Sequence, residues 1–220
     1  MSQRILVVLT SHDVLGSTGR PTGFWLEELV TPLLAFQRAG LQVDLASTRG
    51  GLPPVDPSSA DFDISQIADL DTLLADTMPL KSVDPHGYDA VFLVGGHGTM
   101  WDFPANDTLA EIVSSVYHAG VVAAVCHGVA GLLEATTPEG APLVAERTVT
   151  GFSDAEEALV GADTAIPFSL QQRLKALGAV VEVGEPFTVT VRRDGRLLTG
   201  QNPASSAGVA QALVEALQRP

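Results

Sequence analysis

The most informative segment of the sequence is Val121-Val-Ala-Ala-Val-Cys-His-Gly128. Its five consecutive apolar residues predict a strand that is buried on both faces, as in a parallel sheet. Cys126 follows the strand at once, and residues 129–135 are predicted to be helical. A strand that ends at a nucleophilic residue and turns directly into a helix is the arrangement called a nucleophile elbow. The sequence therefore predicts an α/β fold that displays a sulfur atom at the carboxyl end of a central strand.

Strands and helices alternate along the chain up to this stretch. Apolar runs predict strands, and apolar residues at helical spacing predict helices. Strands are expected at residues 4–9, 41–46 and 88–94, and helices at 24–38, 70–78 and 107–119. Residues 12–23 and 47–68 are polar and contain Gly and Pro, which predicts loops. Such alternation predicts a mostly parallel central sheet with helices on both faces.

The C-terminal part of the chain is expected to complete the same domain. Residues 143–151 predict a strand, and residues 187–199 predict two short strands joined by a hairpin turn at 193–196. Helices are expected at 170–177 and 204–218. Because no internal repeat or linker interrupts the pattern, we expect residues 1–220 to form a single domain.

Composition and charge exclude several classes of partner. The chain has 26 acidic and 12 basic residues, a formal net charge of −14, and 45% hydrophobic residues. An acidic surface repels phosphate groups, so nucleic acids and anionic membranes are not expected partners. No signal peptide is apparent, and no apolar run approaches the roughly 18 residues of a membrane span. One cysteine allows neither an internal disulfide nor a Cys-x-x-Cys metal motif, and we expect a cytoplasmic protein.

Functional sites in open parallel sheets gather at the carboxyl ends of the strands. Segments 10–13, 95–98 and 126–128 lie at such ends. In the last of them, the N–H groups of the following helix would favour a thiolate at Cys126 and lower its pKa. The alternative is that Cys126 is a buried small apolar residue, as lone cysteines often are.

Gly95-Gly-His-Gly98 also has two interpretations. The dinucleotide pattern G-x-G-x-x-G is not met, because the third glycine is missing. Glycines at this position let the backbone approach a substrate oxygen and donate an N–H group, as in an oxyanion hole, with the N–H of His127 as the second donor. A plain tight turn is the alternative.

Two glutamates in the first predicted helix are candidates for acid–base chemistry. Glu27 and Glu28 are neighbours, so they point in different directions on the helix. If the face that carries Glu28 looks toward the sheet end, its protonated carboxyl could hydrogen-bond a thiolate and relay protons. Either glutamate could instead belong to a solvated face. His127 is adjacent to Cys126, and adjacent side chains on an elbow are expected to diverge.

The motifs together resemble one known group of proteins. The segments are Thr22-Gly-Phe-Trp-Leu-Glu-Glu-Leu-Val-Thr-Pro32, Gly95-Gly-His-Gly-Thr99, Trp101-Asp-Phe-Pro104, Ala123-Ala-Val-Cys-His-Gly128, Thr150-Gly-Phe-Ser-Asp-Ala-Glu-Glu157 and Leu198-Thr-Gly-Gln-Asn-Pro-Ala-Ser205. In this order they resemble the ThiJ/PfpI superfamily, within the class I glutamine-amidotransferase-like fold. The branch they resemble holds chaperone-like proteins and glutathione-independent glyoxalases (glyoxalase III). The resemblance implies a flavodoxin-like three-layer sandwich.

The resemblance also implies roles for individual residues. Cys126 would be the nucleophile, Glu28 the helix acid that contacts the sulfur, and His127 the second member of a Cys-His-acid triad. The triad acid would be Glu157, with Asp154 as the alternative. Gly95, Gly96 and His127 would form the oxyanion and substrate-binding backbone.

Histidines limit the other chemistries that the resemblance suggests. No histidine follows His127, which argues against glutamine amidotransferase activity. Some relatives bind a metal through a His/Glu/His set, but no such set can be assembled with conviction from His12, His86, His97, His118 and His127. We therefore expect neither a metal nor a cofactor.

The implied activity is the conversion of methylglyoxal to lactate, or of glyoxal to glycolate, through a hemithioacetal on Cys126. This would make the protein a cofactor-independent lyase. The alternatives are a stress-related holdase chaperone, a redox sensor, a protein deglycase and a cysteine peptidase-like hydrolase. The expected partners are a small dicarbonyl, unfolded or glycated proteins, and a second copy of the chain in a homodimer.

Overall fold

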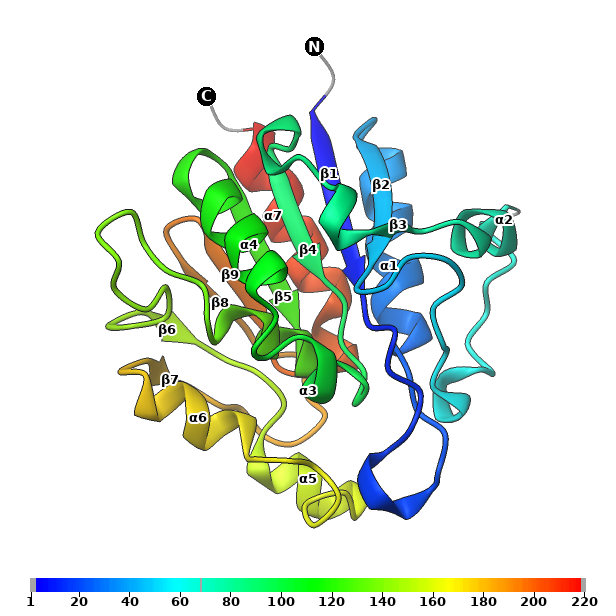
Figure 1. The fold of residues 1–220 in the computed structure, drawn as a ribbon, viewed down its shortest axis with the longest axis vertical. Coiled ribbons are helices and arrows are strands. Elements are labelled where there is room, and N and C mark those ends of the chain that lie inside the picture. The colour runs from blue at the N-terminus through cyan, green and yellow to red at the C-terminus, as the bar shows by residue number, and fades with distance from the viewer. Residues whose placement is uncertain (1–2, 68, 219–220) are drawn as a thin grey trace.

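A mostly parallel sheet forms the centre of the computed structural model, which describes residues 3–67 and 69–218 (Figure 1). In these residues the sheet has seven strands in the order β3-β2-β1-β4-β5-β9-β8. The strands are β1 (Arg4–Leu9), β2 (Gln42–Ser47), β3 (Met78–Pro79), β4 (Ala90–Leu93), β5 (Val121–Val125), β8 (Val191–Asp194) and β9 (Leu197–Gly200). Only β8, at the edge, is antiparallel to its neighbour.

Helices cover both faces of the sheet. They are α1 (Leu26–Arg38), α2 (Leu70–Ala75), α3 (Thr99–Asp102), α4 (Asp107–Ala119), α5 (Asp154–Val160), α6 (Leu170–Ala176) and α7 (Ser206–Gln218). Figure 1 shows α1 and α7 behind the sheet and α3 and α4 in front of it. The predicted fold class, an α/β sandwich around a mostly parallel sheet, is therefore confirmed.

Strand β1 shows why its sequence is apolar without alternation. Ile5, Val7 and Leu9 pack in the core on the α1 and α7 side, whereas Leu6 and Val8 pack in the core on the α4 side. All five side chains are at most 1% exposed. Because helices cover both faces, each position along the strand must be apolar.

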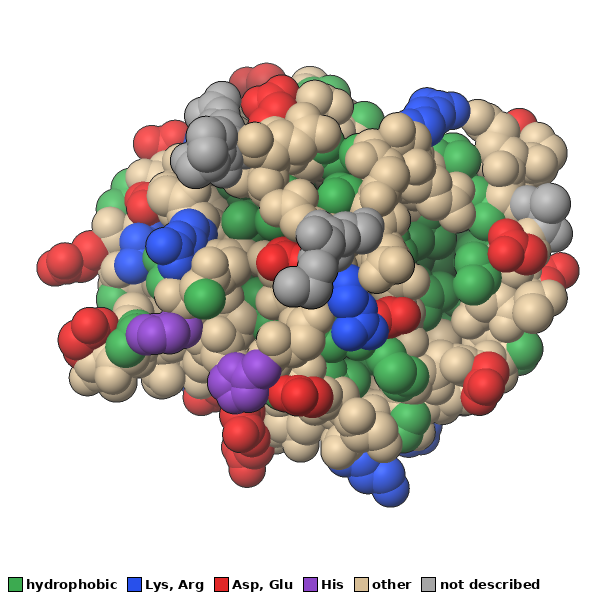
Figure 2. All heavy atoms as spheres, turned by 90° about the horizontal axis from the view of Figure 1, so that it is seen from above, with side chains coloured by type: hydrophobic (Ala, Val, Ile, Leu, Met, Phe, Trp, Pro, Cys, Tyr) green, Lys and Arg blue, Asp and Glu red, His purple; other side chains and the backbone are tan. Residues whose placement is uncertain are grey.

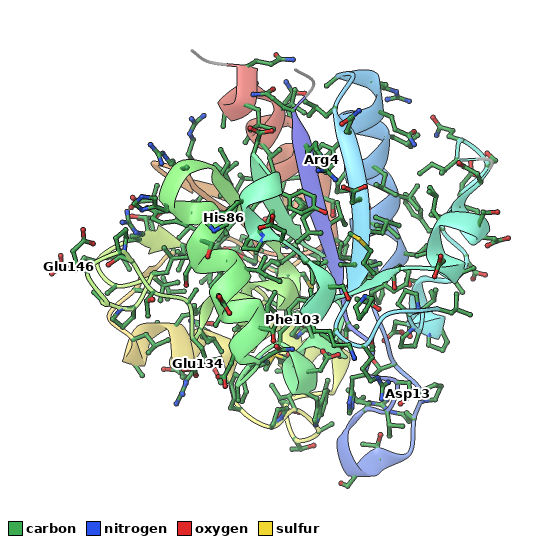
Figure 3. All side chains as sticks on the ribbon, turned by 45° about the horizontal axis from the view of Figure 1, so that its top comes forward. Arg4, Asp13, His86, Phe103, Glu134 and Glu146 are labelled. Atoms are coloured by element: carbon green, nitrogen blue, oxygen red, sulfur yellow. The ribbon has the colours of Figure 1, made fainter. Side chains whose placement is uncertain are left out.

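The prediction of a strand over residues 143–151 is wrong for most of its length. Only β6 (Thr148–Val149) is a strand, and it pairs with β7 (Val180–Val181) in a separate small sheet. Before it, Ala145 donates to the carbonyl of Pro142 and Arg147 to that of Val144, so the chain turns twice. Glu146 has φ 60° and projects from the left edge of the molecule in Figure 3. Because these backbone groups form hydrogen bonds within the turns, this part of the segment forms no strand.

Other predicted boundaries also shift. The helix expected at 70–78 ends at Ala75, because Met78 and Pro79 pair with β2 as the edge strand β3. The helix expected at 129–135 is a 3₁₀ helix that already begins at Cys126 and ends at Leu132. Residues 187–190 lie outside the hairpin β8–β9. Helices α3 and α5 were not predicted.

The carboxyl ends of the parallel strands meet at one end of the molecule, the lower end in Figure 1. Figure 3 labels Arg4 at the start of β1 and Asp13 in the loop beyond its far end. Figure 2 shows the opposite end, where acidic and basic side chains are scattered over the surface. No helix among the described residues is long and apolar enough to cross a membrane.

Candidate active site

The backbone at Cys126 lifts its side chain out of the sheet. Strand β5 ends at Val125, and Cys126 then has φ 56°, which is rare for a residue that carries a Cβ. The 3₁₀ helix begins at the same residue. Such strain is typically retained where the surrounding structure fixes a functional side chain. The Cys126 side chain is 3% exposed and lines a cavity.

Glu28 lies in the first turn of α1 and is completely buried. Neither of its carboxyl oxygens has a hydrogen-bond partner of regular geometry among the described residues. The thiol of Cys126 and the N–H of Gly95 are its polar neighbours. Gly95 has to be a glycine here, because a Cβ would collide with Glu28 Oε2 and would lie 2.9 Å from Cys126 Cβ.

Burial raises the pKa of Glu28 to about 8, and its contacts with Cys126 and Gly95 offset this only in part. At neutral pH the carboxyl is therefore mostly protonated. Glu27 is only partly buried, which identifies Glu28 as the glutamate beside the sulfur.

His127 contacts the sulfur, although adjacent side chains were expected to diverge. Its Nδ1 lies 3.4 Å from Cys126 Sγ, and its Nε2 lies 2.5 Å from Glu157 Oε1. The expectation of divergence is therefore wrong at this turn, where Cys126 has a positive φ of 56°. Burial, and to a lesser degree His97, lower the pKa of His127. A neutral imidazole can accept the thiol proton at Nδ1 while Nε2–H donates to Glu157.

Glu157, and not Asp154, is the carboxylate that contacts this histidine. Burial alone would raise the pKa of Glu157, but His127 and His97 outweigh it and lower the pKa to about 2. The Asp154 side chain instead accepts hydrogen bonds from Ser169 Oγ and from Gln172 Nε2 at the surface. The structure thus brings Cys126, His127 and Glu157 into one hydrogen-bonded chain.

Two side chains near this chain were not predicted to take part. His97 Nε2 lies 3.1 Å from Glu157 Oε2, and the His97 and His127 rings are 4.2 Å apart. The position of His97 after the carboxyl end of β4 could have predicted that its side chain lies at the site. Glu156 is completely buried and accepts hydrogen bonds from four residues. Little in the sequence indicated that Glu156 would be buried, because adjacent glutamates at the start of a helix usually face solvent.

A metal ion could be held by His97, His127 and Glu157. Their ligand atoms lie within 4.8 Å of one another. Two histidines and one glutamate are a set that zinc accepts. The prediction that no histidine set can be assembled did not foresee this grouping.

The prediction of a lowered pKa at Cys126 is wrong. Burial, followed by the charge and hydrogen bonding of Glu28, raises the pKa of the thiol well above its usual value. The N–H of His127 acts in the other direction but is outweighed. A short 3₁₀ helix offers few aligned N–H groups, and this sulfur has lost most of its solvation. The resting group is therefore a thiol beside a protonated carboxyl.

The sulfur opens into a cavity of about 280 Å³. Its lining comes from the segments that follow the strands and from α5: Trp25, Gly96, His97, Cys126, His127, Phe152, Val160, Phe187, Pro203 and Ala204. Gly96 has φ 107° and packs against the backbone of Gly23, so no other residue fits. Its proposed donation to a substrate oxygen stays a prediction.

Comparison with known proteins places this geometry in a family. Glutathione-independent glyoxalase HSP31 of Saccharomyces cerevisiae is 34% identical over 98% of each chain. The crystal structure of glyoxalase III from Candida albicans superposes with a TM-score of 0.90 at 30% identity, over 97% of each chain. That of Rapid Encystment Protein 24 kDa from Francisella tularensis gives a TM-score of 0.94 at 36% identity, over 99% of this chain and 100% of the other.

The model of the DJ-1/PfpI family matches residues 21–216. This range contains the cysteine turn and its glutamate and histidine partners, so the resemblance inferred from the motifs is confirmed. The chain belongs to the DJ-1/PfpI family.

Proposed function

We propose that the protein is a glutathione-independent glyoxalase that converts methylglyoxal to lactate and glyoxal to glycolate. The observation that supports this most is the sulfur of Cys126, which lies between a buried acid, Glu28, and an imidazole, His127, at the floor of a cavity. Relatives that are 32–34% identical over 98% of their length carry the name glyoxalase.

The first step joins the sulfur to the aldehyde carbon, C1. His127 Nδ1 takes the thiol proton as Cys126 Sγ attacks, and the aldehyde oxygen then receives that proton. Backbone N–H groups at Gly96 and His127 would stabilise the oxyanion that forms in between. The product is a hemithioacetal, in which the protein's own sulfur replaces glutathione.

The second step moves hydrogen from C1 to C2. His127 removes the proton on C1, and the Glu28 carboxyl protonates the C2 oxygen, which gives an enediol. His127 then returns its proton to C2, and the hydroxyl on C1 gives its proton back to Glu28. The raised pKa of Glu28 suits this part, because the group carries a proton at neutral pH. C1 is oxidised and C2 reduced, so no cofactor takes part.

In the third step, water hydrolyses the thioester. The sulfur leaves C1 and recovers its proton, and the 2-hydroxy acid is released. Methylglyoxal and one water thus become lactic acid, a lyase reaction that needs no external oxidant or reductant. A cytoplasmic location and a homodimeric state remain part of this proposal.

A holdase activity is a second candidate, favoured by exposed apolar side chains. Leu159, Val160, Phe187 and Val189 are each at least 44% exposed. Exposed apolar surface can bind unfolded chains. A redox-sensing role is disfavoured, because sensor cysteines are accessible and have low pKa values, whereas Cys126 is buried and its pKa is raised.

The decisive experiment replaces the sulfur. We expect Cys126→Ala and Cys126→Ser to lose at least about 10³-fold in kcat/KM for methylglyoxal, measured as lactate formed without added thiol, because no covalent intermediate can form. Circular dichroism should show folded protein. Undiminished turnover in a folded variant would refute the proposal, and suppression of aggregation that survives the substitution would support the holdase.

A further inference from the structure

The cavity above Cys126 is larger and more apolar than a five-atom substrate requires. Methylglyoxal has five non-hydrogen atoms, whereas the cavity measures about 280 Å³. A cavity of about 150 Å³ lined by apolar side chains is sufficient to bind benzene. There is thus room for the dicarbonyl and for a ring-sized substituent.

A series of rings leads from the catalytic imidazole to the protein surface. The His127 and Phe152 rings are 4.4 Å apart, and the Phe152 and Phe187 rings are 6.1 Å apart at an angle of 64°. Phe187 is 45% exposed, so it stands at the mouth of the cavity. Aromatic rings favour offset or edge-on packing at these separations. An aryl group on a bound substrate would extend this series.

The Phe187 backbone is held in a defined position. It has φ 57°, and its N–H donates to Glu156 Oε1 at 2.8 Å. Glu156 is completely buried, so this bond ties the surface loop to the interior. The ring is therefore a preformed wall of the cavity.

Charged groups are missing from the same wall. Among the described residues that line the cavity, none is Lys, Arg, Asp or Glu. The described lining therefore offers no Lys or Arg to bind a carboxylate on the substrate, and the net charge of −14 repels anions. Carboxylate-bearing aldehydes are therefore disfavoured, and uncharged apolar substituents are favoured.

We propose that the site prefers α-oxoaldehydes whose ketone carbon carries a large uncharged apolar group, and that Phe187 determines this preference. The proposal rests on the proposed function and deepens it. Phenylglyoxal represents the class. Its aldehyde carbon adds to Cys126 Sγ, hydrogen passes from C1 to C2, and one water releases mandelate, with the same balance of atoms and electrons as for methylglyoxal.

The test compares initial rates for glyoxal, methylglyoxal, phenylglyoxal and 4-carboxyphenylglyoxal, which is an α-oxoaldehyde that carries a carboxylate, without added thiol. We expect kcat/KM for phenylglyoxal to exceed that for methylglyoxal about tenfold, which corresponds to about 1.4 kcal/mol. The gain should appear mainly in KM, because the ring contacts substrate and transition state alike. 4-Carboxyphenylglyoxal, which differs from phenylglyoxal by one carboxylate, should be a poorer substrate than phenylglyoxal.

Substitutions in the cavity wall test whether Phe187 determines the preference for phenylglyoxal over methylglyoxal. Phe187→Ala should lower the phenylglyoxal-to-methylglyoxal ratio from about ten to about two, and Phe187→Leu should give an intermediate ratio. Val189→Ala is the matched control, because Val189 lies in the same loop, is 67% exposed and does not line the cavity. Its ratio should stay within about twofold of the wild type.

The outcomes separate this proposal from the function on which it rests. Turnover of methylglyoxal that depends on Cys126, with no preference for phenylglyoxal or no change of the ratio in Phe187→Ala, would overturn the preference and leave the function standing. No turnover of any aldehyde would refute the function. Calorimetry with the unreactive ketone acetophenone then decides: binding that Phe187→Ala weakens supports the apolar site, and absence of binding overturns it.

Discussion

Two carboxyl groups that are both 0% exposed differ in what surrounds them. Glu156 accepts five hydrogen bonds of 2.7–3.1 Å: from the N–H and Oγ of Ser153, the N–H of Phe187, Gln201 Nε2 and Asn202 Nδ2. Among the described residues, Glu28 has no hydrogen-bond partner of regular geometry, and burial raises its pKa to about 8.

The difference separates a structural group from a chemical one. The donors around Glu156 come from the start of α5, from the loop at the cavity mouth and from the end of β9, so this side chain joins three segments. The surroundings of Glu28 do little to stabilise a charge, so it retains a proton that it can lend to a substrate. Burial alone therefore does not tell which role a carboxyl has; the number of donors does.

The largest effect on stability is expected at Glu156. Glu156→Ala should lower the free energy of unfolding by about 4 kcal/mol, because buried donors from Ser153, Phe187, Gln201 and Asn202 lose their acceptor. Urea unfolding measures this. Glu185→Gln, an exposed position in the loop that contains Phe187, is the control and should change stability by less than about 0.5 kcal/mol. A loss below 1 kcal/mol at Glu156 would remove the contrast with Glu28.

The pH dependence of stability should show whether Glu28 is protonated in the folded protein. Because its folded pKa is raised from the model value 4.5 to about 8, the folded protein keeps a proton that the unfolded chain releases. The contribution of Glu28 to stability should therefore fall as pH rises from about 4.5 toward 8.

Replacement by glutamine removes this titration. Between pH 5 and pH 8, the unfolding free energy of Glu28→Gln should gain roughly 3 kcal/mol relative to that of the wild type. Glu111→Gln, an exposed position on α4, should run parallel to the wild type. Parallel curves for Glu28→Gln as well would show that the carboxyl is charged in the folded state.

The smallest effect is expected at His97. Its partner Glu157 has two histidine partners, which is fewer than the donors around Glu156 and more than those around Glu28. His97→Gln should lower kcat/KM about tenfold, because Glu157 loses one of the groups that orient it. Since His97 lowers the pKa of His127, the acidic limb of the pH–rate profile should move to higher pH. His86→Gln is the control, because His86 is exposed, lies in the turn that precedes β4 and does not line the cavity. An unmoved limb would show that His97 has no electrostatic influence.

The longer parallel strands of the central sheet were predictable because helices cover both faces, whereas the two-residue edge strand β3 was predicted as the end of a helix. Five apolar residues such as Val121–Val125, rich in β-branched valine and followed closely by a glycine, favour a buried strand over a helix because of their short length. The carboxyl ends of such strands then gave the location of the site. Short elements were not predictable: β7 (Val180–Val181) is two residues long and gains its pairing only from a distant segment.

The members of the site were predictable by motif, but their electrostatics were not. Cys126, His127, Glu28 and Glu157 come together as the motifs implied. Whether the pKa of the thiol is raised or lowered depends on how completely the sulfur is buried and on where the Glu28 carboxyl lies. Neither follows from local sequence. The side chain of His97 was not predicted to take part, because the glycines on either side of it indicated a role for the backbone of this segment.

The crowding around Gly95 and Gly96 has a consequence for how this protein can diversify. Neither position tolerates a Cβ, because neighbouring atoms already occupy that space. The reacting centre is therefore closed to gradual change, whereas the rim, with Val160 and Phe187 at 44% and 45% exposure, has freedom to vary. New substrate ranges would arise by exchanging rim side chains around an unchanged centre, and directed evolution for other carbonyl compounds should begin there.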